Sequence, residues 1–461
     1  MARIGRKRAY NWYCSLIAAS CMVLYGYDNS TFNAISGSAN WDRWFDNIKT
    51  KKSNENLYAA INTAYYVGAI TAGWFMGGPI ADILGRRAGM ASGAACVIAA
   101  TFMQAFAPRG MIGVFIGGRV LIGIGQGLAL TAGPAYINEL APPEIRGEIM
   151  SYWQMFYSVG SFIAYWVGYG CSTHKAKLGE WDWRMIVIFQ LLVPILILSL
   201  VFTLPETPRW YIQHGDRIDD ARASLLRVRD DPEAVETELT SIREAIEFEK
   251  SAISGSYSAL WKDPSVRKRL LIAFALNAGQ QITGQGTLNT YSTIVYQRVF
   301  KDANTIFLIN ALNATCAILF TLNATWTVDR YGRKFLFLVG PDKPSWGATT
   351  WIWTSEIFSM NVRAQAVGMA SQTQNIANVV VQQFFPTFLN RKGFYAFYMF
   401  AGINFLLAVF VWFVVPETRN VPLEEIDVLF GGVNHVERGE HIIAKGEESI
   451  APKGESVQRS G

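Results

Sequence analysis

Two ionisable residues of opposite charge, Asp28 and Arg119, each lie inside a long apolar stretch of the chain. Counting ~1.5 Å per residue from Trp12 puts Asp28 ~24 Å into a ~30 Å hydrocarbon layer, and counting from Met111 puts Arg119 ~12 Å below the opposite face. A charge in hydrocarbon costs at least ~2.5 kcal/mol, so we expect the two to pair. Burial favours a neutral carboxyl and a guanidinium favours an ionised one, so a rearranging pair could take up and release a proton. The alternative is a static ion pair that locks two helices together.

Amide and aromatic side chains within the apolar stretches form a second group of residues, which could bind a ligand. Gln and Asn both donate and accept hydrogen bonds, and an aromatic face can lie against a ring, which suits a ligand rich in hydroxyl groups. Hydrogen bonding between helices is the competing use of such amides.

The elements that hold these residues are predicted to be membrane helices. Charged residues make up 17% of the 461 residues and apolar residues 51%, and apolar runs of spanning length recur. We predict spans near 12–36, 57–77, 88–107, 111–132, 150–170 and 183–204, then near 270–292, 304–328, 364–389 and 394–415. The chain is thus an all-α integral membrane protein.

Charged motifs occur twice, about half a chain apart, and indicate two homologous halves. Asp82 to Arg87 returns as Asp329 to Lys334, and Pro205-Glu206-Thr207 returns as Pro416-Glu417-Thr418. Glu139 with Arg146 likewise returns as Glu356 with Arg363. Duplicated helix bundles that rock about a site between them are a common plan for membrane carriers.

The charge pattern divides the chain into five parts. We expect an N-terminal segment at 1–11, an N-terminal six-helix bundle at 12–206, a polar helical linker at 207–268, a C-terminal bundle at 269–416 and a tail at 417–461. Basic residues at the ends of the first spans fit a cytoplasmic N-terminus, and an even number of crossings puts the C-terminus on the same side.

The second half lacks material that the first half has. Asp82 and Glu139 are 139 − 82 = 57 residues apart, whereas Asp329 and Glu356 are 356 − 329 = 27 apart. Between Lys334 and Glu356 neither apolar piece is long enough to cross a bilayer. We therefore expect ten full spans and a short hairpin or re-entrant piece near 335–350.

These motifs resemble the sugar porters of the major facilitator superfamily. The resemblance rests on the two Asp-x-x-Gly-Arg-Arg/Lys loops, Gly118-Arg119, Pro205 to Arg209, Gln280 to Gly284 and Pro416-Glu417-Thr418 with Leu423-Glu424-Glu425, and covers most of residues 10 to 430. The sequence around Gly26-Tyr27-Asp28 and around Gln285-Gly286 is most similar to that of fungal hexose and lactose-type permeases. The resemblance implies a major facilitator fold of two six-helix halves, in which most of the ninth span and the start of the tenth are missing here.

The resemblance also implies roles for particular residues. Six residues match sugar-contacting positions of the family: Gln154, Gln280, Gln281, Trp351, Gln374 and Asn378. An acid at the position of Asp28 goes with proton symport in the family, so sugar:proton symport is expected, with Asp28 and Arg119 as the coupling pair. Gly286 stands where the family usually has Asn and Asn375 where it often has Trp, so a disaccharide is as credible as a hexose.

The repeated charged loops are expected to act as a latch at the cytoplasmic face. Alternating ion pairs there could hold that end closed and then release it. The residues assigned to this latch are Asp82, Arg86, Arg87, Glu139, Arg146, Asp329, Arg333, Glu356 and Arg363. Topology signalling by basic residues is the alternative for Arg87 and Lys334.

Several other functions are disfavoured by the sequence. There is no nucleophile with a base that would indicate an enzyme, no metal-ligand cluster among four histidines, no cofactor motif and no basic stripe for nucleic acid. The glycines Gly123, Gly125 and Gly127 lie within an apolar helix and predict close helix packing. A monomer in the plasma membrane with both termini cytoplasmic is expected. A facilitative uniporter, a non-transporting sugar sensor and an inactive truncated carrier remain as alternatives.

Overall fold

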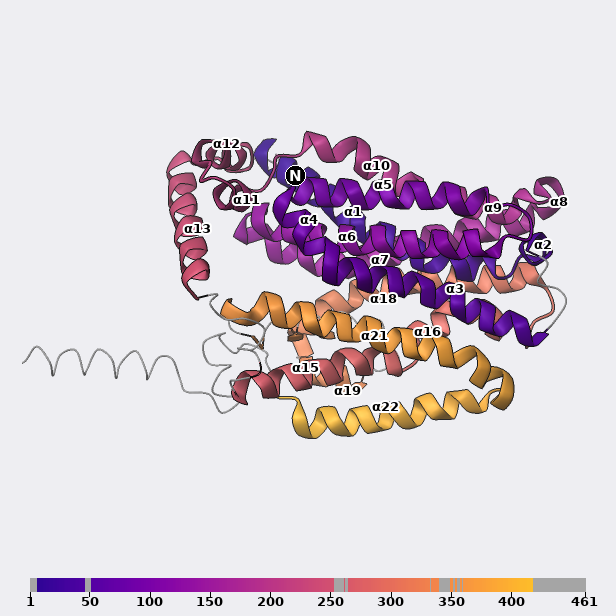
Figure 1. The fold of residues 1–461 in the computed structure, drawn as a ribbon. Helices are drawn as coiled ribbons and strands as arrows, with labels where there is room; N and C mark the ends of the chain where they lie inside the picture. Colours follow the sequence, from indigo (N-terminus) through magenta and orange to yellow (C-terminus); the bar gives the residue numbers. More distant parts are fainter. Residues whose placement is uncertain are drawn as a thin grey trace, which may run out of the picture.

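The computed structural model describes residues 6–45, 51–252, 261, 264–331, 333–339, 349–350, 353–354, 357–358 and 360–417. These residues form long helices that run roughly side by side in two groups (Figure 1). We call the end of the molecule that carries α11, α12 and α13 the linker end, and the opposite end, with α2 and α8, the distal end.

The first group, here the N-half, contains six predicted spans in chain order. Its helices are α1 (Arg6–Ile35), α2 (Ala39–Trp44), α3 (Lys51–Thr71) with the π-turn η2 (Ala72–Met76) and α4 (Gly77–Ile83), α5 (Arg86–Ala105), α6 (Ile112–Leu140), α7 (Pro143–Thr173), α8 (Lys175–Leu178), α9 (Trp181–Phe189), α10 (Leu192–Leu200) and the 3₁₀ turn η3 (Val201–Thr203). Glycines permit the closest crossings within this group. A Cβ at Gly125 would lie 2.7 Å from the Gly93 carbonyl of α5, and one at Gly127 would lie 2.9 Å from the Ala69 carbonyl of α3. The prediction that this glycine run packs helices is confirmed.

The linker forms amphipathic helices against the end of the N-half. These are α11 (Pro208–Gln213), α12 (Ile218–Val228) and α13 (Pro232–Ala252), drawn at the left of Figure 1. Leu225 and Val228 of α12 are buried in the same core as α1 and α6, and Asn11 of α1 donates to the Val228 carbonyl at 2.7 Å. The linker is therefore part of the N-half body.

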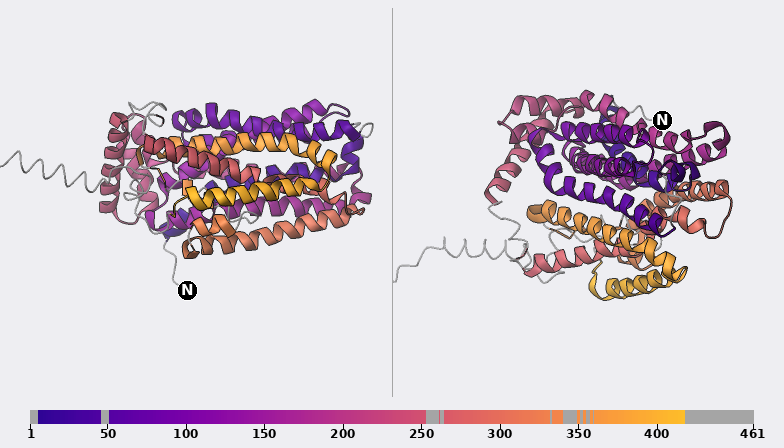
Figure 2. Two further views of the ribbon diagram at one scale, coloured as in Figure 1. Left: turned by 90° about the horizontal axis from the view of Figure 1, so that it is seen from below. Right: turned by 45° about the vertical axis from the view of Figure 1, so that its right-hand side comes forward.

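The second group, the C-half, contains fewer long helices in the described chain. It comprises α15 (Pro264–Ile282), α16 (Gln285–Thr290), α17 (Ser292–Tyr296), α18 (Ala303–Tyr331), α19 (Arg333–Val339), α21 (Met360–Lys392) and α22 (Tyr395–Val414). A left-handed Gly284, φ +92°, interrupts the helix between α15 and α16. The halves meet where α18 packs on α7 and α21 packs on α3, as Figures 1 and 2 show.

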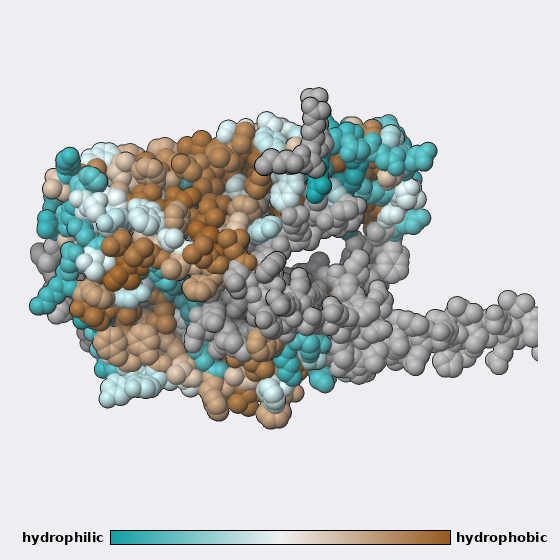
Figure 3. All heavy atoms as spheres, turned by 180° about the vertical axis from the view of Figure 1, so that it is seen from behind, coloured by the Kyte–Doolittle hydropathy of each residue, from teal (hydrophilic) through white to brown (hydrophobic). Residues whose placement is uncertain are grey.

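The predicted spans all fall on helices, but two of them are interrupted. The span near 183–204 is divided between α9 and α10, and the span near 270–292 is divided between α15 and α16. By length and hydropathy, five helices of the described chain could cross a membrane: Arg86–Ala105, Ile112–Leu140, Trp181–Thr203, Ala303–Leu322 and Tyr395–Val414. The other predicted spans are helical but more polar, because helices such as α1 and α21 carry the polar residues that meet between the halves. Apolar side chains gather in the middle of the surface and hydrophilic ones toward the ends (Figure 3).

The internal repeat appears as equivalent contacts in the two halves. Glu206 accepts from the Arg87 backbone N–H at 3.2 Å, and Glu417 accepts from the Lys334 N–H at 2.9 Å. Tyr136 donates to the Pro205 carbonyl at 2.9 Å, and Trp353 donates to the Pro416 carbonyl at 3.4 Å. Since Trp353 precedes Glu356 by the same three residues as Tyr136 precedes Glu139, the chain resumes at the linker end of the fourth helix of the repeat.

The shortened region follows from this register. In the N-half, α5 and α6 pack along their whole length, whereas their C-half counterparts are reduced to the seven residues of α19 and the short described pieces around Thr350, Trp353 and Ile357. Trp353 and Ile357 are nonetheless fully buried. The residues that remain at this end of the repeat, Trp353 and Ile357, therefore still pack in one core with α15 and α22.

Candidate functional site

The structure brings Asp28 and Arg119 together in the core of the N-half. Their exposed fractions are 0% and 1%. The Arg119 guanidinium donates to the main-chain carbonyl of Asp28 at 3.0 Å and lies 4.8 Å from the centre of the Tyr65 ring. Both carboxylate oxygens of Asp28 lack a hydrogen-bond partner. The two groups are thus neighbours in an arrangement where the cation is held by the backbone and an aromatic face.

A chain of polar contacts begins at the residue after Asp28. Asn29 donates to the Tyr157 hydroxyl at 2.7 Å and accepts from the Tyr66 hydroxyl at 2.9 Å. Tyr66 in turn lies within interaction range of Asn378 and Thr290 in the C-half. The carboxyl on α1 is therefore one residue from a network that reaches the other half. Asn29, Tyr66 and Tyr157 were not among the site residues predicted from the sequence, although amides and tyrosines inside apolar spans were the available signal.

Four of the predicted solute-contacting amides lie on two adjoining helices of the C-half. Gln280 and Gln281 end α15, and Gln374 and Asn378 lie in the middle of α21, which packs against α15. The Oε1 atoms of Gln280 and Gln374 lack hydrogen-bond partners. Unsatisfied buried acceptors of this kind suit a hydroxyl-bearing ligand.

The structure also shows the surroundings of Gly286 and Asn375, the two residues that depart from the family pattern. A Cβ at Gly286 would lie 3.0 Å from Oε1 of Gln281, so the glycine leaves room beside that amide. Asn375 donates to Gln372 one turn earlier at 3.2 Å and remains on α21. Trp351 lies outside the described residues, and for Gln154 only its place in α7 is described.

At the distal end a polar cluster around Asn33 joins the halves. The Asn33 amide nitrogen lies 2.8 Å from the Tyr165 hydroxyl, 2.8 Å from the Asn289 carbonyl and 2.7 Å from the Ser292 hydroxyl. The main-chain carbonyl of Asn33 accepts from the Thr293 hydroxyl at 3.0 Å. The described polar contacts between the halves run from this cluster to the middle of the molecule, where Ser158 meets Thr321 at 3.3 Å. The distal end is therefore closed.

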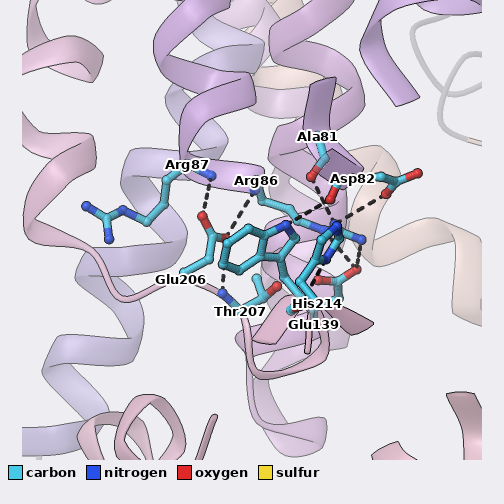
Figure 4. Close-up of polar contacts among 9 residues, drawn as sticks. Ala81, Asp82, Arg86, Arg87, Glu139, Glu206, Thr207 and His214 are labelled. Atoms are coloured by element: carbon cyan, nitrogen blue, oxygen red, sulfur yellow. Dashed lines mark hydrogen bonds and ion pairs between the residues drawn. The ribbon is translucent and has the colours of Figure 1, made fainter. Parts of the chain in front are cut away.

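At the linker end, four predicted latch residues of the N-half lie near one another: Asp82, Arg86, Arg87 and Glu139 (Figure 4). The Arg86 guanidinium pairs with Glu139 at 3.0 Å and with Asp82 at 3.3 Å, and it donates to the Ala81 carbonyl at 2.9 Å. Arg87 instead donates to the carbonyls of Val201 at 3.3 Å and Phe202 at 2.9 Å. Arg86 thus ties α4, α5 and α6, whereas Arg87 ties α5 to the end of the sixth span.

The remaining latch predictions fall where side chains are not described. Glu356 lies outside the described residues, and only the helical positions of four others are described: Arg146, Asp329, Arg333 and Arg363. Their predicted roles stay predictions.

Glu206 is a buried acid of this cluster to which the sequence analysis assigned no role. Its carboxylate accepts from the backbone N–H groups of Arg86 at 3.1 Å, Arg87 at 3.2 Å and Thr207 at 3.0 Å. Burial raises the pKa of Glu206, and these three donors oppose the rise. The carboxylate sits over Gly85, whose φ of +99° starts α5 and whose Cβ, were it present, would overlap it. Pro205-Glu206-Thr207 is therefore the cap of α5.

We expect Glu206→Ala to lower the free energy of unfolding by about 2 kcal/mol, because it uncaps α5 and leaves two buried N–H groups and one partly buried N–H group without acceptors. Thermal unfolding of the purified protein in detergent measures this. Glu180→Ala is the matched control, since Glu180 is an exposed acid before α9. Equal unfolding temperatures for the two variants would contradict the capping role.

Comparisons with known proteins agree with the repeat and the fold. The family model described as "Sugar (and other) transporter" matches residues 14–341 and 343–430, with its interruption at Asp342, inside the shortened region. Probable quinate permeases are similar: that of Aspergillus terreus is 28% identical over 92% of this chain and 88% of its own length, and that of Aspergillus clavatus is 28% identical over 92% and 89%.

Solved structures share the fold. The proton:xylose symporter XylE bound to 6-bromo-6-deoxy-D-glucose aligns with a TM-score of 0.76 at 23% identity, over 92% of this chain and 99% of that one. The inward-open conformation of XylE from E. coli aligns with a TM-score of 0.75 at 24% identity, over 91% and 100%. The predicted fold class is confirmed.

Proposed function

Since the chain belongs to the Sugar (and other) transporter family of the major facilitator superfamily, we propose that it carries a sugar across a membrane by alternating access and couples this movement to a proton. The observation that carries the proposal is the polar chain from Asn29 through Tyr66 toward Asn378, which starts beside Asp28 and crosses between the halves. A solute bound by these groups would contact both the proton-binding helix and the opposite half.

Alternating access requires that each end can open in turn. The closed distal end, held by Asn33, Ser292 and Thr293, corresponds to one of the two states. Breaking these neutral hydrogen bonds and separating α1 from α17 would open that end. The Arg86 cluster at the linker end stays within the N-half and would move with it as a unit.

The chemistry of the central residues favours a neutral polyol. The described side chains of this region are amides and the hydroxyls of Tyr and Thr residues, and among the described cations Arg119 beside Asp28 is already bonded to the Asp28 carbonyl. A carboxylated ring such as the quinate named for the relatives would need a free cation to balance its charge. We therefore place a hexose or disaccharide before a hydroxy acid.

The membrane setting belongs to the same proposal. A monomer in the plasma membrane, with its linker end and both termini in the cytoplasm, would take sugar from the distal side. Uniport would arise if Asp28 kept one protonation state throughout the cycle, and sugar sensing would use the same amides without crossing. The shortened ninth and tenth spans give the inactive-carrier alternative its physical basis. In the described part of the C-half, only the seven residues of α19 and short pieces of chain stand where α5 and α6 pack against each other in the N-half.

Uptake into transporter-deficient cells tests the proposal. We expect radiolabelled glucose, xylose or lactose to accumulate above the outside concentration, and a proton uncoupler to reduce this to equilibration. Uptake without accumulation at any pH would indicate a uniporter. Binding without uptake would indicate a sensor. The absence of both binding and uptake would indicate an inactive carrier. Radiolabelled quinate is measured in the same cells, to test whether the solute is a hydroxy acid and not a sugar.

A further inference from the structure

The sixth span of the N-half is broken at a buried glutamine. Helix α9 ends at Phe189 and α10 begins at Leu192, and Gln190 lies between them with an exposed fraction of 1%. Pro194 explains the break, because it has no N–H to donate to the Gln190 carbonyl four residues earlier. The Gln190 N–H bonds to Val187, three residues back, instead of to Ile186, four residues back.

The break frees a carbonyl that fastens α9 to the proton-binding helix. The Ile186 carbonyl accepts from the Tyr27 hydroxyl at 2.8 Å, in a buried bond. Tyr27 is the residue before Asp28 and Ile186 lies one turn before Gln190, so this bond holds the broken part of the sixth span beside the turn of α1 that carries the acid. The Gln190 amide consequently lies within interaction range of the Asp28 carboxyl.

The polar atoms of these two side chains lack other partners. Both carboxylate oxygens of Asp28 and both amide atoms of Gln190 are buried without a hydrogen bond of standard geometry. The titratable and charged groups described around Asp28 are Tyr27 on α1, Tyr65 on α3 and Arg119 on α6. Buried polar atoms without hydrogen-bond partners lower the stability of the fold, so we expect them to gain partners in another state of the molecule.

We propose that Gln190 is a positioning residue for Asp28, which donates its amide N–H to the ionised carboxylate and accepts from the protonated one through its carbonyl oxygen. A primary amide can serve both forms because it carries two donors and an acceptor. Gln190 therefore holds the carboxyl in place while its proton comes and goes, and Arg119 supplies the charge. This inference rests on the proposed proton coupling but concerns the acid itself.

The test is Gln190→Met, which keeps the length of the side chain and removes its strong hydrogen bonds. Infrared difference spectra of the purified protein against pH report the carbonyl stretch of protonated Asp28, with Asp28→Asn to assign the band. We expect the pH at which half of this band disappears to be about 1 unit higher in Gln190→Met than in the wild type. Both forms of the acid lose a hydrogen bond, but the bond to the charged carboxylate is the stronger one, so the ionised form loses more. Gln190→Asn retains an amide, so its midpoint pH should lie between those of the wild type and Gln190→Met. This variant tests the proposal if Gln190→Met does not fold.

The outcomes separate this inference from the proposed function. An unchanged midpoint in Gln190→Met or Gln190→Asn would overturn it, since a merely structural glutamine would alter stability without moving the titration. A shifted midpoint in a protein whose sugar uptake ignores the uncoupler would leave the positioning role standing and refute the proton coupling.

Discussion

Asp28→Asn protein should still exchange sugar across vesicle membranes but should no longer concentrate it. One proton moving through 100 mV supplies about 2.3 kcal/mol, which corresponds to a concentration ratio of about 50. The amide cannot take up that proton, so the ratio should fall to about 1. Arg119 keeps its bond to the main-chain carbonyl of residue 28, so the helices should stay packed. Uptake of the radiolabelled sugar that the wild type accumulates most strongly, with an imposed pH gradient, measures the ratio.

Counterflow without a gradient provides the internal reference for this experiment. Its rate should remain within about threefold of the wild-type rate, because binding and rocking do not require the proton. Asp42→Asn is the matched control, since Asp42 is a part-buried acid at the distal end that accepts from Tyr58 at 3.0 Å. Concentrative, pH-dependent uptake by Asp28→Asn protein would contradict the coupling role.

A second large effect is expected at the crossing of α1 and α7. A Cβ at Gly160 would lie 2.7 Å from the Tyr27 nitrogen and still closer to the Val23 carbonyl, and Gly26 faces the Tyr157 carbonyl in the same way. Gly160→Val would therefore push the two backbones apart. We expect a loss of at least ~3 kcal/mol of stability, because rigid backbone cannot yield as a side chain can. The yield of monodisperse protein in size-exclusion chromatography should fall more than about tenfold.

The same helix offers a control for this change. Gly170 lies in α7 as well, and a Cβ there would have no atom within 4 Å. Gly170→Val introduces the same β-branched residue into the same helix and should leave the yield near that of the wild type. Similar yields for the two valine variants would show that the Gly26 and Gly160 contact does not limit folding.

Local pattern was sufficient for most of the fold. Apolar length and the recurrence of Asp82 to Arg87 at Asp329 to Lys334 predicted two bundles, and the spans so predicted are helices. These features could be read directly because each depends on residues close together in the chain. The missing residues between Lys334 and Glu356 could likewise be counted, and the family match is interrupted there.

The candidate site was predicted unevenly. Asp28 and Arg119 were paired from their depths alone, and the structure brings them together, but through the Asp28 carbonyl and not through its carboxylate. Glu206 received no role, because its function as a cap of α5 requires three N–H groups, two of which lie about 120 residues away. The spacing of apolar residues along the chain predicts local helices, and it does not predict a contact between residues so far apart in sequence.

The sequence by itself determined that this chain is a duplicated membrane bundle with an acid and a guanidinium at matching depths, since hydropathy and depth are properties of single helices. Only the tertiary structure decided that Asn29 and Tyr66 reach toward the other half, that Asn33 closes the distal end and that Gln190 stands beside Asp28. Those facts depend on how helices rotate and cross, which is fixed by glycine contacts and by a proline-induced break acting between segments far apart in the chain.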